Sequence, residues 1–278
     1  QLAYWQELLG GEQPVLELPL DHPRPAQQSH RGASLQVHLP ADLVAGIKRL
    51  AQQEGVTPFM LLLASFQTLL HRYSGQADIR VGVPNANRNR VETERLIGFF
   101  VNTQVLKADL DGQMTFRQLL AQVKERTLQA QSHQDLPFEQ LVEALEPGRS
   151  LSHSPLFQVL FNHQANIADA AQITTRSGLA LEKVELHKHS ARFDLALDTY
   201  ESAGRLHATF TYALDLFDAA TIVAMGEHWV QLLQGLVADA SCAVGELPLL
   251  VAGTPHIDTP ALALDDTCIH HLIEQAGA

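Results

Sequence analysis

Pairs of histidines and pairs of carboxylates are the residues whose types and spacing could do chemistry in this chain. His187 and His189 are two residues apart, so on a strand both imidazoles would lie on one face, as a metal pair requires. His270 and His271 are adjacent in the sequence. Asp194 and Asp198 would share one face of a strand, as a pair of acid–base carboxylates could.

None of these pairs has the neighbours that its chemistry needs. Two histidines without a carboxylate or cysteine cluster make a poor ligand set, so we predict no metal site. No aspartate follows His270 and His271, which we interpret as the solvated start of a helix. We interpret Asp194 and Asp198 as structural carboxylates. The sequence also lacks G-x-S-x-G, G-x-x-x-x-G-K-[ST], H-E-x-x-H and C-x-x-C motifs.

Composition limits the classes of partner. The chain has 278 residues, of which 46% are hydrophobic and 18% charged, which is ordinary for a globular protein. Its formal net charge of −12 argues against nucleic-acid binding, which needs a basic face. The longest apolar run, residues 59–70, is too short to cross a bilayer, so we expect no membrane partner. Two cysteines and no signal peptide favour a reduced, cytoplasmic setting.

Helix and strand patterns alternate along the chain. Thr57-Pro58 predicts a helix start, and residues 115–118 form a capping-box pattern. Other helices are predicted over residues 2–9 and 41–53, from Pro137 to near residue 147, and after a capping Asp218. Strands are predicted near residues 35–39, 79–83, 98–106, 157–161, 181–186, 193–199 and 206–212. This order predicts an α/β two-layer sandwich, a mixed sheet covered by helices.

Two stretches read as connections between such elements. Residues 12–30 contain four prolines, which predicts an extended connector without a regular element. The tail from Ala240 is rich in proline and small residues, which predicts a linker that does not join the core. The chain opens with Gln1 in a helical pattern, so we expect a fragment of a longer protein.

Three ordered segments are similar to motifs of the condensation domains of nonribosomal peptide synthetases. Residues 96–103 read LIGFFVNT, after GVPNANR at residues 82–88, and resemble the family's IGxFVNT. Residues 133–139 read HQDLPFE, which resembles HQDxPFE. Residues 149–164 read RSLSHSPLFQVLFNHQ and resemble RDxSRxPLFQVxFxxQ, with His153 where arginine is common. Weaker matches are residues 192–195, 216–218 and 246–250.

The resemblance implies a fold and a division of the chain. The family fold has two lobes like chloramphenicol acetyltransferase, with a tunnel between them. Residues 1–30 would be a connector from the N-terminal lobe, residues 31–250 the C-terminal lobe, and residues 251–278 a linker and the start of an adenylation domain. The family's catalytic HHxxxDG motif would lie upstream of residue 1. The resemblance therefore implies no catalytic residue in this chain.

The resemblance also implies a reaction and its partners. Condensation domains join an aminoacyl or peptidyl donor to an aminoacyl acceptor, each carried as a thioester on the 4'-phosphopantetheine of a carrier domain. We expect no cofactor bound directly. Expected partners are the N-terminal lobe, the donor and acceptor carrier domains and the adenylation domain, with the fragment inactive alone. The alternatives are a heterocyclisation or epimerisation relative, and a non-catalytic platform that docks carrier or adenylation domains.

Site residues follow from the matched motifs. On the tunnel side we expect Asn102 and Thr103 as polar wall groups, although Asn102 could instead tie down a loop. Gln134 and Asp135 could face the tunnel or cap the helix behind Pro137. Arg149 and Ser152 would stabilise a loop near the tunnel or near the 4'-phosphopantetheine arm of a carrier domain. Contacts to a phosphate of the arm or to an acidic carrier surface are expected from Arg88 and Arg90, unless these arginines are only solvated.

Overall fold

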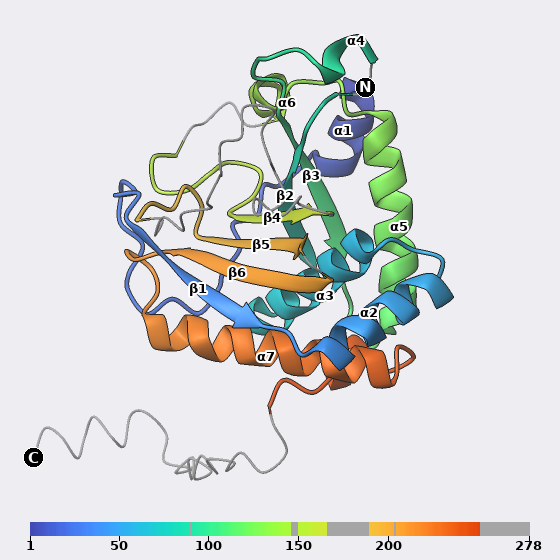
Figure 1. Ribbon diagram of the computed structural model, residues 1–278. Helices are drawn as coiled ribbons and strands as arrows, with labels where there is room; N and C mark the ends of the chain where they lie inside the picture. The colour runs from blue at the N-terminus through green and yellow to red at the C-terminus, as the bar shows by residue number, and fades with distance from the viewer. Residues whose placement is uncertain (89–90, 146–149, 166–188, 203, 251–278) are drawn as a thin grey trace, which may run out of the picture.

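A six-stranded mixed sheet forms the centre of the computed structural model, which describes residues 1–88, 91–145, 150–165, 189–202 and 204–250 (Figure 1). The strand order is β1-β6-β5-β4-β2-β3. The β2–β4 and β4–β5 pairs are parallel, and the other pairs are antiparallel. The strands are β1 (Gly32–His38), β2 (Asp78–Asn85), β3 (Asn102–Asp109), β4 (Val159–Gln164), β5 (Leu195–Ser202) and β6 (Arg205–Ala213).

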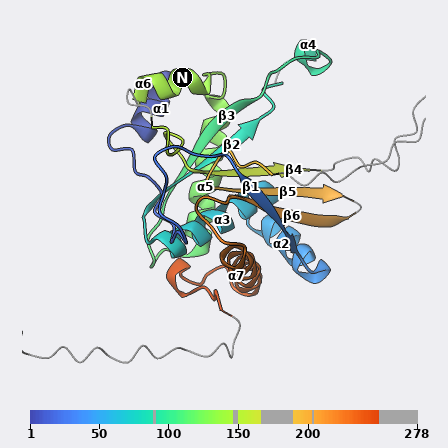
Figure 2. The ribbon, with the colours of Figure 1, turned by 90° about the vertical axis from the view of Figure 1, so that its left-hand side faces the viewer.

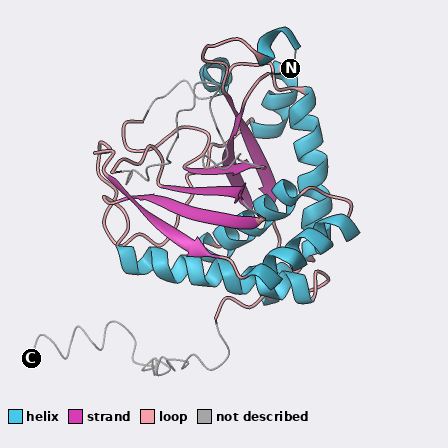
Figure 3. Cartoon of the chain, in the orientation of Figure 1, coloured by secondary structure: helices cyan, strands magenta, loops and turns pink. Residues whose placement is uncertain are grey.

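Helices cover one face of this sheet, as Figures 2 and 3 show. The α3 and α5 helices pack on β2 and β3, and α7 packs on β1 and β6. The helices are α1 (Leu2–Leu9), α2 (Ala41–Gln53), α3 (Pro58–Ser74), α4 (Val91–Glu94), α5 (Phe116–Ser132), α6 (Phe138–Leu145) and α7 (Ala219–Ala238). The predicted α/β fold with a mixed, helix-covered sheet is confirmed.

The core lies between the sheet and α3 and α7. The ring of Phe66 in α3 contacts Phe161 of β4 and Phe210 of β6. The indole of Trp229 in α7 contacts Phe210 edge-on and donates a hydrogen bond to the Ser65 hydroxyl, 3.0 Å away. Because side chains alternate along a strand, the residues next to Phe161 and Phe210 point away from these helices.

Several predicted helix starts are confirmed. The Thr57 hydroxyl accepts a hydrogen bond from the Met60 backbone N–H at 3.2 Å, and Pro58 occupies the first turn. Thr115 and Gln118 form the predicted capping box at α5. The helix predicted over residues 41–53 has those bounds. At Thr57 and Thr115 the capping interactions are local in sequence, which is why the sequence pattern identifies them.

The cap of α7 differs from the prediction. Asp218 is the N-cap residue by position, but its side chain makes no cap hydrogen bond and instead lies 3.0 Å from His22. The carboxylate of Asp21 takes its place, accepting from the Asp218 N–H at 2.8 Å and from the Thr221 hydroxyl at 2.9 Å. Those hydrogen bonds favour the charged carboxylate and lower the pKa of Asp21. The cap therefore comes from a distant segment.

Two further expectations need correction or qualification. The strand predicted from residue 98 begins only at Asn102, because residues 98–101 belong to a loop with exposed apolar side chains. The tail from Ala240 is not a free linker at its start, since Ala240, Val244 and Leu247 are buried in the core. The strand predicted near residues 181–186 lies outside the described residues, as do His187, His270, His271 and residues 251–278.

The segment between α1 and β1 has no helix or strand, as its prolines predict, apart from a single bridge between Arg31 and Ser190. It is nevertheless packed, because Leu16 and Leu18 are buried, as are Trp5 and Leu9 of α1. Within the residues that the structure describes, no helix is both long and apolar enough to cross a membrane.

Candidate functional site

Asn102 forms the hydrogen-bonding centre of the two matched motifs at the start of β3. Its amide nitrogen donates to the carbonyl oxygens of Gln134 at 3.1 Å and Leu136 at 2.8 Å. Its amide oxygen accepts from the N–H groups of Phe138 at 3.0 Å and Thr103 at 2.9 Å. Asn102 therefore fastens the loop between α5 and α6 to the sheet and caps α6.

Gln134 and Asp135 have different partners in the same loop. The side-chain oxygen of Gln134 accepts from the Asn85 amide at 2.5 Å, which joins the end of β2 to the α5–α6 loop. The carboxylate of Asp135 is exposed and accepts from the Gln1 amide at 3.2 Å. The side chain that receives the Phe138 N–H at the start of α6 is that of Asn102. Asn102 therefore provides this hydrogen bond at the start of α6, and the tunnel-side or capping roles of Gln134 and Asp135 stay predictions.

Thr103 lies on the other face of the sheet from Asn102. Thr103 pairs with Pro84, and Gly82, two residues earlier on β2, pairs with Leu160 of β4. Cross-strand partners share a face, so Thr103 lies on the face that carries Leu160. Asn102 points toward the loop after α5 instead. The sequence places the two residues together, and the pleat separates their side chains.

The face of β1, β4, β5 and β6 that points away from the helices is named the open face. It is predominantly polar, and its residues align in rows across the strands. One row is Gln164, Tyr200, His207 and His38, and the next is Asn162, Asp198, Thr209 and Gln36. Most of these side chains are partly or fully exposed. A row of polar groups across an exposed sheet face offers hydrogen bonds to a ligand or to a partner protein.

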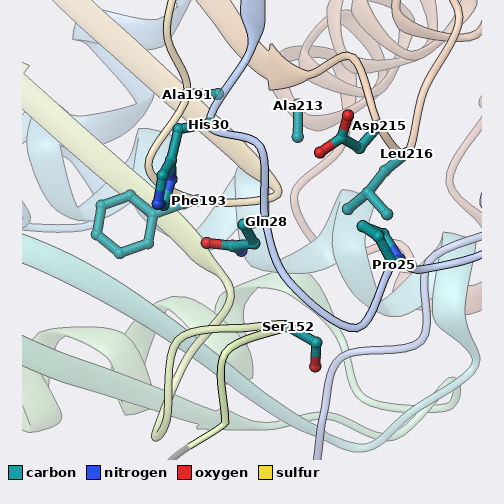
Figure 4. A pocket seen from close by; sticks show the side chains of 9 residues that line it. All are labelled: Pro25, Gln28, His30, Ser152, Ala191, Phe193, Ala213, Asp215 and Leu216. Carbon is teal, nitrogen blue, oxygen red and sulfur yellow. The ribbon is translucent and has the colours of Figure 1, made fainter.

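Ser152 lies beside a partly buried ion pair between Arg24 and Asp194. Arg24 donates two hydrogen bonds to the Asp194 carboxylate, at 2.9 and 2.5 Å, and a longer one to the Ser152 carbonyl at 3.4 Å. The Ser152 hydroxyl lies 2.8 Å from Nδ1 of His153. Ser152 also lines a small pocket with Pro25, Gln28, His30, Ala191, Phe193, Ala213, Asp215 and Leu216 (Figure 4).

The charge in that pocket belongs to Asp215. The hydrogen bonds that Asp215 accepts from Ser29, including one from its backbone N–H at 2.9 Å, lower the pKa of the carboxyl group. His30 next to it has a positive φ of 59°. The pocket thus lies between the segment before β1 and the loop after β6. The hydrogen bonds from Ser29 to Asp215 link that segment to that loop.

The segment of residues 91–101 between β2 and β3 begins with α4 and carries several exposed apolar side chains, and it is named the apolar loop. Ile97 and Phe99 are 105% and 90% exposed, and Val91, Leu96 and Val101 are exposed with them. Arg88 lies at the base of the loop, donating to the Thr93 carbonyl with its guanidinium 4.4 Å from the centre of the Phe100 ring. Contiguous exposed apolar side chains of this size are typical of an interaction surface.

Some predicted site residues lie outside the described part of the chain, namely Arg90 and Arg149. The arm or carrier contact predicted for Arg88 stays a prediction, as do the tunnel positions of the other site residues. Among the described residues no group of three or more histidine, cysteine, aspartate or glutamate side chains could hold a metal ion. Asp194 and Asp198, which could have formed a pair, bind Arg24 and Asn162 respectively.

Comparison with protein families decides the assignment. A family model described as "Condensation domain" matches residues 1–254. The chain belongs to the condensation domain family. It is 48% identical over 279 residues to a component of the linear gramicidin synthase of Brevibacillus parabrevis, covering 98% of this chain and 4% of that one. A second component of the same synthase is 50% identical over 255 residues, covering 90% and 5%. This condensation-domain chain spans only a small part of these synthetases.

Solved structures agree with this family. A crystal structure of a four-domain nonribosomal peptide synthetase bound to AMP and glycine has a TM-score of 0.81 and 27% identity, covering 91% of this chain and 20% of that one. The X-domain from teicoplanin biosynthesis has a TM-score of 0.80 and 27% identity, covering 90% and 56%. The resemblance to condensation domains and their chloramphenicol-acetyltransferase-like fold is thereby confirmed.

Sequence reasoning missed two features of this site. The first is the Arg24–Asp194 pair, whose members are 170 residues apart, so no local pattern links them. The second is the hydrogen bond from Asn162 to Asp198, which depends on the register between β4 and β5. Only the alternating polar residues of β4 and β5 could have suggested an exposed polar face.

Proposed function

We propose that this chain is the C-terminal lobe of a condensation domain that joins two carrier-bound substrates through an amide bond. The observation that carries the proposal is the pairing of an exposed apolar loop with a polar sheet face that the described helices leave uncovered. The family match and the similarity to two components of linear gramicidin synthase support it. The chain also covers only about half of some solved chains of this fold, for instance 56% of the teicoplanin X-domain.

The apolar loop is proposed as the docking surface for the N-terminal lobe. Leu96, Ile97 and Phe99 would be costly to leave in water, because each large apolar side chain gains about 1.5–3 kcal/mol on full burial. The contact between the Arg88 guanidinium and the Phe100 ring stabilises the loop. A second lobe of the same domain is the proposed occupant, because the matched X-domain chain is covered to only 56% by this one.

The proposed reaction forms one bond and breaks another. The acceptor amine attacks the donor thioester carbonyl, the new C–N bond forms, and the C–S bond breaks. The amine loses a proton, and the donor arm leaves as a thiol that gains one. The histidine that handles the amine is expected in HHxxxDG, upstream of residue 1. The 4'-phosphopantetheine arms belong to the carrier domains and enter as parts of the substrates.

The role of this lobe in the proposed reaction is to position the reactants. Holding two reactants in line can supply ~7–11 kcal/mol of the barrier in favourable cases. Thr103 and the polar rows of the open face would line one wall of the tunnel, while Asn102 keeps β3 and α6 in place behind that wall. Arg88 would contribute through the shape of the apolar loop.

A binding experiment tests the proposed lobe interface. The upstream lobe is titrated into this chain by isothermal titration calorimetry, with wild type and with the double variant Ile97→Ser/Phe99→Ser. Removing two large apolar anchors should raise Kd roughly a hundredfold. Leu128→Ser is the matched control, because Leu128 is 49% exposed but lies on α5. Equal affinities for wild type and the double variant would rule out this interface.

A further inference from the structure

Asp198 occupies the middle of the open face. It lies on β5 opposite Asn162 of β4 and Thr209 of β6. The Asn162 amide nitrogen donates a hydrogen bond to its Oδ1 at 3.0 Å. The Asn162 amide thereby fixes the orientation of the carboxylate, and both side chains are partly exposed. A carboxylate oriented by a neutral donor keeps its negative charge available to a ligand.

Asp198 is paired with a neutral amide, whereas the other carboxylates of the described strands are paired with cations. The described strands carry four carboxylate residues: Asp78, Asp109, Asp198 and Glu201. Asp78 binds Arg80 at 2.9 Å, Asp109 binds Lys107 at 3.0 Å, and Glu201 binds Lys48 at 2.7 Å. Within the described part of the chain, Asp198 has no such cation within 4.0 Å. This sheet therefore neutralises three carboxylates and leaves the fourth facing outward.

Aromatic rings lie next to Asp198 on the same face. Tyr200 is two residues further along β5, a separation of about 7 Å along the strand. Its ring stacks on the imidazole of His207, with centroids 4.6 Å apart and planes 8° from parallel. His207 in turn pairs with His38 across β6 and β1. An oriented carboxylate recognises an ammonium group through a charge-assisted hydrogen bond, and here the stacked rings border that carboxylate along the strand.

We propose that Asp198, oriented by Asn162 and flanked by the Tyr200–His207 stack, binds a primary ammonium group of the aminoacyl substrate. The inference deepens the proposed function, because it assumes that the open face lines the path of a carrier-bound substrate. Asp198 is a specificity-determining residue here. It holds the charged amine before reaction and takes no proton from it. The ammonium belongs either to the α-amine of the acceptor or to a basic side chain.

Matched pairs of stable ligands distinguish these two sources. Each is an amide-linked aminopantetheine analogue, titrated calorimetrically into the complete condensation domain with its upstream lobe. Glycyl and hydroxyacetyl analogues differ in the α-amine, and ornithyl and norvalyl analogues whose α-amines are both acetylated differ only in the side-chain amine. Asp198→Asn removes the charge and keeps the shape of the side chain. Asp42→Asn, an exposed residue on α2, is the control for the change in net charge.

The expected result is a loss of binding that depends on the amine. Asp198→Asn should weaken the amine-bearing member of one pair about tenfold or more, the effect of losing a hydrogen bond to a charged group, and leave its partner unchanged. Asn162→Ser, which retains the charge, should cause a smaller loss with the same selectivity. This second variant decides the question if Asp198→Asn fails to fold.

Two results would overturn the inference. One is equal binding of every analogue by wild type and both variants, and the other is an equal loss for the amine-bearing and amine-free members. The proposed function is tested separately, by whether the wild-type domain forms an amide from two loaded carriers. Amide formation with no amine-dependent effect of Asp198→Asn would reject the ammonium site alone, whereas no amide formation by wild type would reject the proposed function.

Discussion

Arg24 and Asp194 form a partly buried ion pair with two hydrogen bonds, which joins the proline-rich segment to the start of β5. The guanidinium donates at 2.9 and 2.5 Å, and the side chain of Asp194 is 3% exposed. The Asp194 backbone is also anchored, since its N–H donates to the Gln158 carbonyl at 3.0 Å. Gln158 in turn accepts from the Leu16 N–H at 2.7 Å. The segment before β1 is therefore fastened to the sheet at several points.

Removing Arg24 should destabilise the chain strongly. Arg24→Ala leaves the Asp194 carboxylate buried and unpaired, which costs about 3–5 kcal/mol in the free energy of unfolding. Arg31→Ala is the control, because Arg31 is largely exposed and lies 3.8 Å from Asp215, so a change below about 1 kcal/mol is expected. Urea unfolding measures both. Similar losses in the free energy of unfolding for the two variants would show that the Arg24–Asp194 pair stabilises the fold no more than an exposed ion pair does.

Gly82 should not tolerate a side chain. A Cβ at this position would lie 2.2 Å from Cε2 of Phe157, whose ring is held by contacts with Phe138 and Phe193. Gly82→Ala should therefore lower the free energy of unfolding by about 1–3 kcal/mol. Gly112→Ala is the control, since the nearest atom to its Cβ would be 4.0 Å away. A stable Gly82→Ala variant would mean that the Phe157 ring moves readily.

Asn102 and Thr103 should respond differently to substitution. Asn102→Asp replaces the donor to the Gln134 and Leu136 carbonyls with an oxygen, and we expect a loss of about 2–4 kcal/mol in folding stability. Thr103→Val keeps the shape and should change stability by less than about 0.5 kcal/mol. Its effect should appear in the rate of amide formation instead. Denaturant unfolding and a single-turnover assay separate the two. Equal destabilisation by both substitutions would contradict this division.

Stability should fall as the pH decreases below about 6.5, in part because of His163. Burial lowers the pKa of His163, and its Nδ1 lies 2.9 Å from the Thr199 hydroxyl, which donates to the Asn162 carbonyl. The unfolded chain therefore binds a proton first, so this contribution is present above pH 6.5 and is lost as the pH falls toward the folded pKa. His163→Gln should reduce the difference between urea unfolding at pH 7.5 and 5.5.

An unchanged pH dependence in the His163→Gln variant would assign the acid loss to other groups. His228 is one of them, since burial lowers its pKa too and its Nδ1 lies 2.6 Å from the Tyr73 hydroxyl. Burial raises the pKa of Tyr73 to about 12. For that group the sign is opposite, because stability is present below pH 10 and is lost as the pH rises toward 12.

Local interactions made much of the fold predictable. Thr57 and Thr115 bind N–H groups three residues away, so their caps can be recognised within a short window. Phe99 misled the strand prediction, because an exposed aromatic residue looks the same in sequence as a buried one. Ala240 and Val244 misled the linker prediction. Small residues near prolines are typical of exposed linkers, yet these two are buried in the core.

The candidate site could be predicted only where a motif carried it. The matched segments located Asn102 and Gln134, which are hydrogen-bonded, but not the pleat that turns Thr103 away from Asn102. Asp21 caps α7 from about 200 residues away, and Asn162 meets Asp198 only through strand register. These contacts are set by tertiary packing, which leaves no trace in a short window of sequence.

The assay that tests the central proposal most directly is amide formation from a loaded donor and a loaded acceptor carrier. It compares this chain alone, the upstream lobe alone and the two together, with product measured by mass spectrometry. We predict product only when both lobes are present. Product from this chain alone, or none from both lobes with matched substrates, would contradict the proposal. Carrier binding without turnover would favour the docking-platform alternative.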